Sequence, residues 1–409
     1  MQSWSRGPRG NPLGVISLVV VYLMFGTFWG CWAVGVLAFQ RQHDMSFGQI
    51  GWLYIALTIT AVVTMTLITP RIAHLPYEVS IPAAVLLYGM GIALLAWVPE
   101  EWLVLAFAFA GIGTGMIDVL VNGAGHALET ASGRSILQKI HAAYGLGTAV
   151  GGVATGFALA ADLPFNFVLT ETALLQGLGI SAMWSTYAFR ERIGAERLES
   201  NITLSAFRRF PGLFVPALIV LSAFFIEGSL DVWSGAYLQQ TLGATLIASG
   251  FGVAAFGLAT ALGRIFASRI LFGMGYRRTI LFSALGSVAA GILAVAAPNP
   301  TVASAAYLIL GFSLASAAPA AFGAVEGSGP QAGVSIAAVT TVGYAGFVIG
   351  PPIMGWLADV SGGIRVVMIV ITAATFGILA GGVLTRNGRS PSRPEDGPPA
   401  DRTPQLTRG

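Results

Sequence analysis

Charged side chains are scarce in this 409-residue chain: Asp, Glu, Lys and Arg together make up 10% of it, against about 25% in a soluble domain. Hydrophobic residues account for 55%. A water-soluble protein of this length would have to expose apolar surface and would aggregate. The scarcity of charge therefore excludes a soluble enzyme, a disordered protein and a nucleic-acid binder, and it predicts a chain that uses the lipid bilayer as its solvent.

Metal-binding and catalytic patterns are also lacking. Cys31 is the single cysteine, which excludes a disulfide framework and a cysteine-based metal site. The four histidines have no metal-ligand spacing, so we expect neither a metal nor a cofactor. The chain has no P-loop, and no recognised motif places a nucleophile beside a base. We therefore expect neither an ATP-driven pump nor an enzyme.

Long apolar runs are what the sequence has in abundance. A helix needs roughly 20 apolar residues to cross the hydrocarbon core of a bilayer, and twelve such runs are present. They are Leu13–Phe39, Phe47–Thr69, Val79–Val98, Trp102–Asn122, Ile140–Ala161, Phe167–Phe189, Leu213–Leu238, Thr245–Ala267, Thr279–Ala297, Thr301–Phe322, Val334–Ala358 and Val366–Leu384.

Basic residues orient these runs. If the N-terminus is cytoplasmic, 19 of the 21 Lys and Arg residues fall on the cytoplasmic side, and only Arg41 and Arg365 fall outside. This asymmetry follows the positive-inside rule. It predicts a multi-pass protein of the bacterial inner membrane with both termini in the cytoplasm.

Polar segments divide the chain into five parts. We expect a cytoplasmic tail over 1–12, a six-helix half over 13–189, a cytoplasmic linker over 190–211, a second half over 212–385 and a disordered tail over 386–409. Four glycines of the first half recur 199 residues later, at spacings that allow close helix packing. They are Gly51, Gly147, Gly151 and Gly156, which correspond to Gly250, Gly346, Gly350 and Gly355.

A parallel repeat of six plus six spans is the plan of the major facilitator superfamily, and local segments strengthen this resemblance. Residues 111–152 resemble its fucose-permease-like branch, whose sugar/proton symporters carry an acid and an asparagine where Asp118 and Asn122 stand. Residues 227–263 resemble the span 7 signature of the same branch. The resemblance implies an all-α membrane protein with twelve transmembrane helices, in two six-helix halves related by pseudo-two-fold symmetry.

Acids inside the spans are candidates for proton coupling, because a charge in the bilayer costs about 2.5–3.5 kcal/mol. The candidates are Asp118, toward the inner part of its span, and Glu227 and Asp231, one turn apart on one helix face. Burial favours the neutral acid, which can then load and release a proton. The alternative is a fixed structural hydrogen bond. No basic residue is expected at the same depth, which argues against a permanent salt bridge.

Two further groups complete the candidate site. Residues that could contact a substrate are Asn122, Trp29, Trp32, Tyr144, Gln176, Trp233 and Tyr344, with packing or structural bonding as the alternative. Residues that could form a cytoplasmic gate are Glu129, Arg134, His141, Arg264 and Arg277, with solvated loop charges and helix capping as the alternative.

The resemblance implies a monomeric secondary transporter that moves a small, sugar-like polar solute by alternating access, with proton symport as the coupling. Its partners would be the solute, the proton and the lipid bilayer, and no nucleic acid. Proton-driven efflux of a drug or metabolite remains open, because the same acids serve an antiporter. A receptor built on a transporter fold also remains open, and it should tolerate loss of Asp118 and Glu227.

Overall fold

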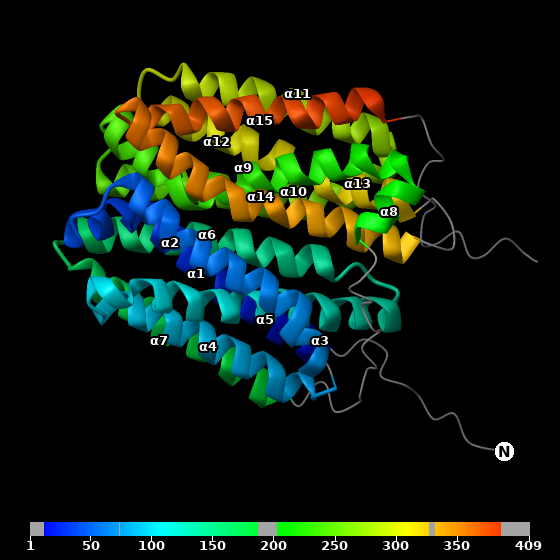
Figure 1. The fold of residues 1–409 in the computed structure, drawn as a ribbon, viewed down its shortest axis with the longest axis horizontal. Coiled ribbons are helices and arrows are strands. Elements are labelled where there is room, and N and C mark those ends of the chain that lie inside the picture. Colours follow the sequence, from blue (N-terminus) through cyan, green and yellow to red (C-terminus); the bar gives the residue numbers. More distant parts are fainter. Residues whose placement is uncertain (1–11, 73, 187–202, 327–331, 386–409) are drawn as a thin grey trace, which may run out of the picture.

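The computed structural model describes residues 12–72, 74–186, 203–326 and 332–385 (Figure 1). The expected tails and most of the expected linker lie outside these residues. The described helices are α1 (Pro12–Gln42), α2 (Phe47–Val63), a π-helical turn (Thr64–Ile68), α3 (Thr69–Ile72), α4 (Tyr77–Trp97), α5 (Leu103–Ser132), α6 (Leu137–Ala160), α7 (Phe165–Thr186), α8 (Thr203–Arg209), α9 (Phe214–Leu242), α10 (Leu246–Met274), α11 (Tyr276–Val295), α12 (Pro300–Leu314), α13 (Ala317–Glu326), α14 (Ala332–Ser361) and α15 (Arg365–Leu384).

All twelve predicted spans are helical over most of their described residues. Eleven helical segments of the described chain are long and apolar enough to cross a membrane. The remaining long helix, α7, carries Asn166, Glu171 and Gln176, which lower its hydropathy, and it packs against α1 and α4. The tenth span consists of two helices, α12 and α13, separated at Ala315 and Ser316.

Two helices extend by seven or more residues beyond their predicted ends. The fourth span runs to Ser132 rather than Asn122, and it stops where Gly133 adopts a left-handed φ of +64°. The eighth runs to Met274 rather than Ala267. These extensions move Asp118 to the middle of α5, not its inner part, and they leave Arg264 ten residues from the end of α10 rather than three. The hydropathy pattern missed them because it marks only the apolar run that crosses the bilayer, and both helices continue past that run into more polar, partly exposed turns.

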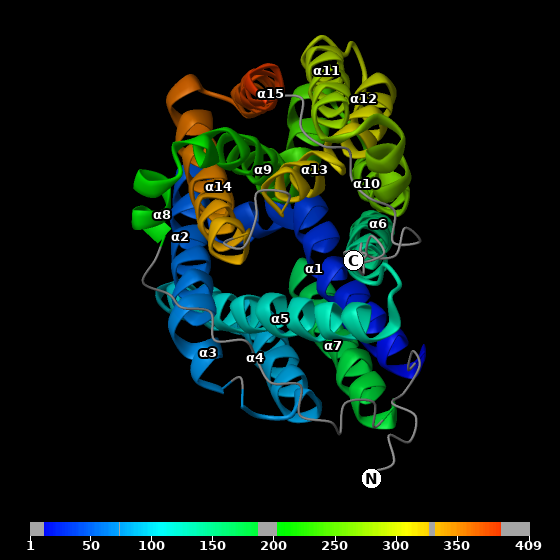
Figure 2. The ribbon, with the colours of Figure 1, turned by 90° about the vertical axis from the view of Figure 1, so that its right-hand side faces the viewer.

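The helices form two halves that meet chiefly along two helix pairs, with further contacts of α1 on α9 and α10. The first half comprises α1–α7 and the second α8–α15. In Figure 2, α2 lies against α14 on one side of the molecule and α6 lies against α10 on the other. The cavity described below lies between these two pairs.

The glycine repeat marks these contacts. Gly156 packs on the backbone carbonyl of Leu246 in the other half, and Gly355 packs on the carbonyl of Phe47. Adding 199 to Gly156 and Phe47 gives Gly355 and Leu246, so the contact of the first half on the second is repeated by the second on the first. This is the contact pattern of a pseudo-two-fold axis, and it confirms the predicted symmetry.

The two ends of the bundle differ. Basic residues gather at the end where α5 passes into α6 and α10 into α11, which we call the basic end. They are Arg71, Arg134, Lys139, Arg208, Arg209, Arg269, Arg277 and Arg278. Arg41 and Arg365 lie at the opposite end, where α1 passes into α2 and α14 into α15.

That opposite end is closed by hydrogen bonds between the halves, and we call it the sealed end. The Asp359 carboxylate at the end of α14 accepts from the Ser46 hydroxyl at 2.6 Å and from the backbone N–H groups of Phe47 and Gly48 at 3.0 and 2.8 Å. The Gln239 amide donates to the carbonyl of Val34 at 2.9 Å. Asp359 thus binds the N-terminus of a helix in the other half, where negative charge is favoured.

Candidate functional site

A cavity of about 180 Å³ lies between the two halves. Helices α1, α2, α5 and α6 line it from the first half, and α9, α10 and α14 from the second. Its wall is mostly aromatic and aliphatic. The charged residues on it are Asp118, Glu227, Asp231 and Arg264. All three predicted proton-coupling acids therefore share one site, including Asp231, which the sequence allowed to reach outside water.

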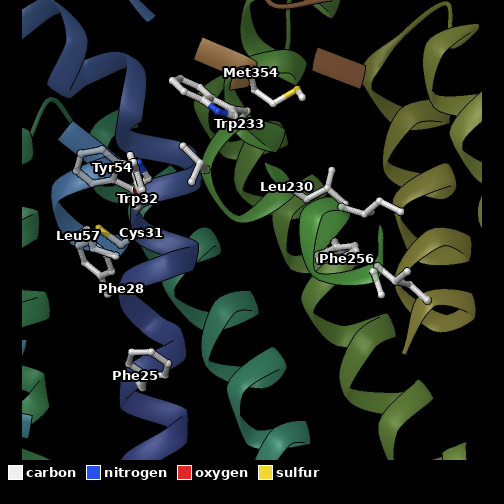
Figure 3. Close-up of a cluster of buried hydrophobic side chains, with 14 of the residues drawn as sticks. Phe25, Phe28, Cys31, Trp32, Tyr54, Leu57, Leu230, Trp233, Phe256 and Met354 are labelled. Atoms are coloured by element: carbon white, nitrogen blue, oxygen red, sulfur yellow. The ribbon is translucent and has the colours of Figure 1, made fainter. Parts of the chain in front are cut away.

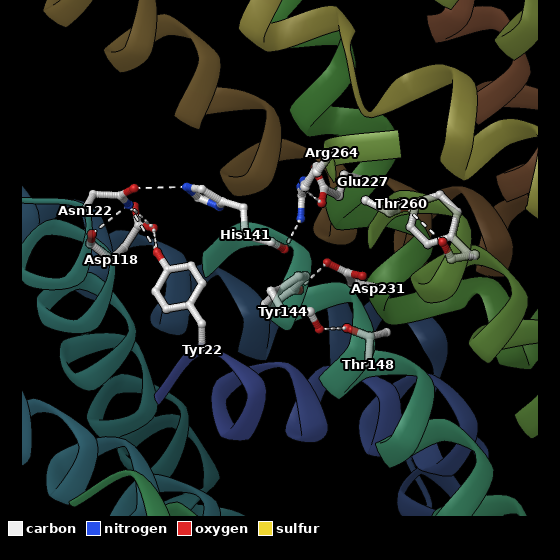
Figure 4. Close-up of polar contacts among 11 residues, drawn as sticks. Tyr22, Asp118, Asn122, His141, Tyr144, Thr148, Glu227, Asp231, Thr260 and Arg264 are labelled. Carbon is white, nitrogen blue, oxygen red and sulfur yellow. Dashed lines mark hydrogen bonds and ion pairs between the residues drawn. The ribbon is translucent and has the colours of Figure 1, made fainter. Parts of the chain in front are cut away.

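Asp118 is held by neutral hydrogen-bond donors (Figure 4). The Tyr22 hydroxyl donates to its Oδ1 at 2.9 Å and the Asn122 amide at 3.1 Å. On the other oxygen, Oδ2, the Tyr344 hydroxyl of α14 donates from the second half. The Asn122 carbonyl oxygen in turn lies 2.9 Å from Nε2 of His141. Asp118 thus has three donors, one of which crosses between the halves.

Glu227 forms a buried ion pair with Arg264. The two side chains are 12% and 14% exposed, and their closest N–O distance is 2.5 Å. Arg264 also donates to the backbone carbonyl of His141 at 3.0 Å, across to the first half. This corrects the expectation that no basic residue lies at the depth of the acids. Arg264 had been assigned to the cytoplasmic side because the eighth span was predicted to end soon after it.

Asp231 makes the third connection between the halves. Its Oδ2 accepts from the Tyr144 hydroxyl of α6 at 2.7 Å. The Tyr144 ring also lies beneath the guanidinium of Arg264, with 5.9 Å between Cζ and the ring centroid. Each of the three acids is therefore tied, directly or through Arg264, to a residue of the other half.

The predicted substrate contacts divide into two sets. Trp29, Tyr144 and Tyr344 line the cavity, and Asn122 lies directly behind Asp118. The other three, Trp32, Trp233 and Gln176, lie outside the lining.

Packing and backbone bonds explain these three exceptions. Trp32 is fully buried in an aromatic cluster beside Tyr54 (Figure 3). The Trp233 indole donates to the Pro351 carbonyl at 3.1 Å. The Gln176 amide donates to the Met24 carbonyl at 3.0 Å, so it makes the structural bond that was the alternative.

The predicted gate residues do not form one cluster. His141 and Arg264 belong to the cavity. Glu129 accepts from the backbone N–H of Leu137 at 3.1 Å and so caps the start of α6, as the alternative held. Arg134 lies in the exposed turn before α6, and Arg277 lies in the first turn of α11. Neither reaches the polar contacts of the cavity.

Among the cavity residues that were missed from the sequence, two lie on α1 beside Asp118. Tyr22 bonds Asp118, and Phe25 lines the wall next to it. The signal was present, because Tyr22, Phe25 and Trp29 stand at i, i+3 and i+7 on one face of α1. Only Trp29 was singled out on that face.

Two six-helix halves around a shared central cavity define the fold of a secondary transporter. The profile of the Major Facilitator Superfamily matches residues 16–344 and 217–407. The chain belongs to this superfamily and is a multi-pass membrane protein.

Individual relatives agree with the family. An uncharacterised MFS-type transporter of Yersinia pestis is 25% identical over 349 residues, which cover 85% of this chain and 89% of the relative. A bacterial homologue of the lysosomal transporter Spinster, crystallised inward-facing and unoccupied, is similar with a TM-score of 0.72 at 13% identity, covering 93% of this chain and 97% of that one. The E. coli fucose:proton symporter has a TM-score of 0.58 at 13% identity, covering 93% of this chain and all of that one. These structural likenesses show the fold, and the fucose-permease-like branch stays a prediction.

Proposed function

We propose that this protein is a proton-coupled secondary transporter that moves a small organic solute across the bacterial inner membrane by alternating access. The observation that carries the proposal is the placement of all three cavity acids in connections between the halves. Asp118 is bonded by Tyr344, Asp231 by Tyr144, and Glu227 through Arg264 to the His141 carbonyl. The cavity is complete within one chain, so a monomer suffices.

These connections link the occupancy of the cavity to its conformation. A carboxylate only accepts hydrogen bonds, whereas a protonated carboxyl also donates one. A proton on Asp118 therefore competes with the donors Tyr22, Asn122 and Tyr344 for the same oxygens. Because the Tyr344 bond joins the halves, loading this acid changes the free energy of holding them together.

Charge placement supports an orientation. With the basic end in the cytoplasm, the sealed end faces outward, and we assign the structure to a state that is closed to the outside. The same orientation puts the ends of α1 and α15 that lead to the termini on the cytoplasmic side, as the sequence predicted. The inward-facing crystal structure of the Spinster homologue is consistent with this assignment.

The lining bears on the kind of solute. Sugar-like symport was the expectation from the sequence, yet a sugar needs many free hydrogen-bonding groups. Most polar groups here are bonded to one another, and the remaining wall is aromatic and aliphatic. This favours the alternative, in which a drug-like or metabolite solute with an apolar face is exchanged for protons.

Proteoliposomes with a trapped pH-sensitive dye test the proposal. A thermal-shift screen of sugars, polyols and amphipathic metabolites at two pH values first supplies a stabilising solute. We expect wild-type protein to move protons when that solute is added, and Asp118→Asn to lose proton-driven accumulation while keeping solute counterflow. Asp162→Asn, at an exposed acid of the α6–α7 turn, is the matched control. Wild-type coupling in Asp118→Asn would refute the proton role.

A further inference from the structure

The cavity holds more carboxyl groups than its cation can balance. Asp118, Glu227 and Asp231 line it, and Arg264 is the one Lys or Arg on the lining. Arg264 is committed to Glu227 at 2.5 Å and to the His141 carbonyl. Asp118 and Asp231 are therefore held by neutral donors, and among the described residues neither has a salt-bridge partner.

Asp231 is the acid with room for a ligand. It is 5% exposed, and only its Oδ2 has a described hydrogen-bond partner, the Tyr144 hydroxyl. Asp118 differs, because donors occupy both of its oxygens. A buried carboxylate with a free oxygen on a cavity wall attracts a donor that carries positive charge.

Four aromatic rings form a continuous arc along the wall from this point. Tyr144, which bonds Asp231, lies 5.7 Å from Phe25, Phe25 lies 6.5 Å from Trp29, and Trp29 lies 6.3 Å from Tyr54, measured between ring centroids. All four rings line the cavity. Aromatic faces attract organic cations through their quadrupoles and bury apolar bodies equally well.

The far end of the arc has an unused polar group. Tyr54 is 1% exposed, and its hydroxyl has no hydrogen-bond partner among the residues that the structure describes. The Thr114 hydroxyl, also on the lining, has none either. Both hydroxyl oxygens are buried, and a buried hydroxyl without a partner costs about 1–3 kcal/mol, so a ligand gains from bonding one of them when its side chain turns toward the cavity.

From these observations we infer that the solute is an organic ammonium ion with a body of about one ring, its ammonium at Asp231 and its ring along the arc. This inference rests on the proposed transport function and names the class of solute. A cavity of about 150 Å³ accommodates benzene, so about 180 Å³ suits a one-ring amine. The aromatic wall disfavours a bare metal ion, which prefers oxygen ligands. On the described lining the one Lys or Arg, Arg264, is already paired with Glu227, so no free cation there can hold an anionic solute.

Equilibrium binding to the full-length purified protein tests the charge preference. The probes are 2-phenylethylamine, 2-phenylethanol and phenylacetate, which share a ring and differ in charge. We expect the amine to bind at least about tenfold more tightly than the alcohol, from its carboxylate contact and cation–π attraction, and phenylacetate to bind most weakly. D-glucosamine, D-glucose and D-glucuronate repeat the comparison on a polar ring.

Variants assign the preference to one residue. Asp231→Asn should bring amine binding down to the level of the alcohol, whereas Asp231→Glu should keep the amine favoured and Asp162→Asn should match wild type. If Asp231→Asn does not fold, the wild-type series and Asp231→Glu still decide. Equal binding of alcohol and amine, retention of the preference in a folded Asp231→Asn, or no binding of either amine at millimolar concentration would overturn the inference.

The two proposals fail separately. If D-glucose binds as tightly as D-glucosamine and drives proton movement in proteoliposomes, the transporter proposal stands and the ammonium inference falls. If the amines bind as expected but no solute moves protons, the site is assigned correctly and the coupling is not.

Discussion

Asp359 is predicted to hold the sealed end closed, and its removal should shift the protein toward the state open at that end. Its carboxylate bonds Ser46, Phe47 and Gly48 across the two halves, so these contacts exist only while the end is closed. An acid at a helix N-terminus contributes about 0.3–1 kcal/mol through the helix dipole, and capping bonds add a comparable amount. Since Asp359 is exposed, we take about 1–2 kcal/mol in total, which is roughly a 5–30-fold change in an equilibrium.

The helix itself should survive the change. Ser46 caps α2 with its own hydroxyl, which accepts from the Gln49 N–H at 3.2 Å. In turn, Oε1 of the Gln49 side chain accepts from the Ser46 N–H at 2.7 Å. Asp359→Ala therefore removes the link between the halves and leaves this capping box in place. By the repeat of 199 residues, the position in the first half that corresponds to Asp359 is residue 160. It is an alanine, so its side chain cannot make the corresponding bonds to the N-terminus of α10.

Alkylation of an engineered cysteine measures the shift. Val34 is fully buried between the halves near the sealed end, so Val34→Cys in a Cys31→Ala background reacts with maleimide only when that end opens. Asp359→Ala should accelerate the reaction roughly 5–30-fold. Asp162→Asn, at an exposed acid of the same end with a φ of +59° that Asn tolerates, should not. An unchanged rate in Asp359→Ala would show that this contact does not bias the two states.

Two further predictions concern the middle of the molecule. Arg264→Met should lower the thermal unfolding midpoint in detergent, because leaving Glu227 unpaired costs about 3–5 kcal/mol, and combining it with Glu227→Gln should restore most of the loss; no restoration would argue against the pair. Gly257→Ala should reduce solute counterflow, because a Cβ there would lie 2.5 Å from the Gly145 carbonyl and force α6 and α10 apart. The control is Gly273→Ala on the same helix, where a Cβ meets nothing within 4 Å, and equal counterflow in both variants would contradict this reasoning.

The fold could be predicted from features that are recognisable without knowing which residues pack against them. A run of about 20 apolar residues is readable without knowing its neighbours, so the spans were found. The glycines were informative for a related reason, because a position where two backbones touch admits no side chain. Gly156 and Gly355 stand in such contacts in both halves, which is why their equal spacing revealed the repeat.

The site was less predictable because its geometry depends on which groups neighbouring helices supply. The orientation of the basic residues assigned Arg264 to the cytoplasmic side, near the predicted end of its span, whereas Glu227 from α9 provides the charge that lets it remain inside α10. Trp233 and Gln176 are residue types that often contact substrates. Their side-chain N–H groups, however, donate to the backbone carbonyls of Pro351 and Met24. Only the packed structure shows which polar groups are already satisfied.

The two sets of contacts between the halves respond differently to the solute. The sealed-end bonds of Asp359 lie outside the cavity, so they set a fixed bias toward the present conformation. The bonds of Asp118 and Asp231 lie on the cavity wall, so a proton or an ammonium ion changes them directly. A ligand shifts the equilibrium between two conformations only by as much as its affinities for them differ. If the Asp359 contacts contribute about 1–2 kcal/mol, the solute needs about a 5–30-fold preference for the state open at the sealed end to offset them. Weakening that link should therefore raise the apparent outward affinity for solute by the same factor, because the coupling is reciprocal.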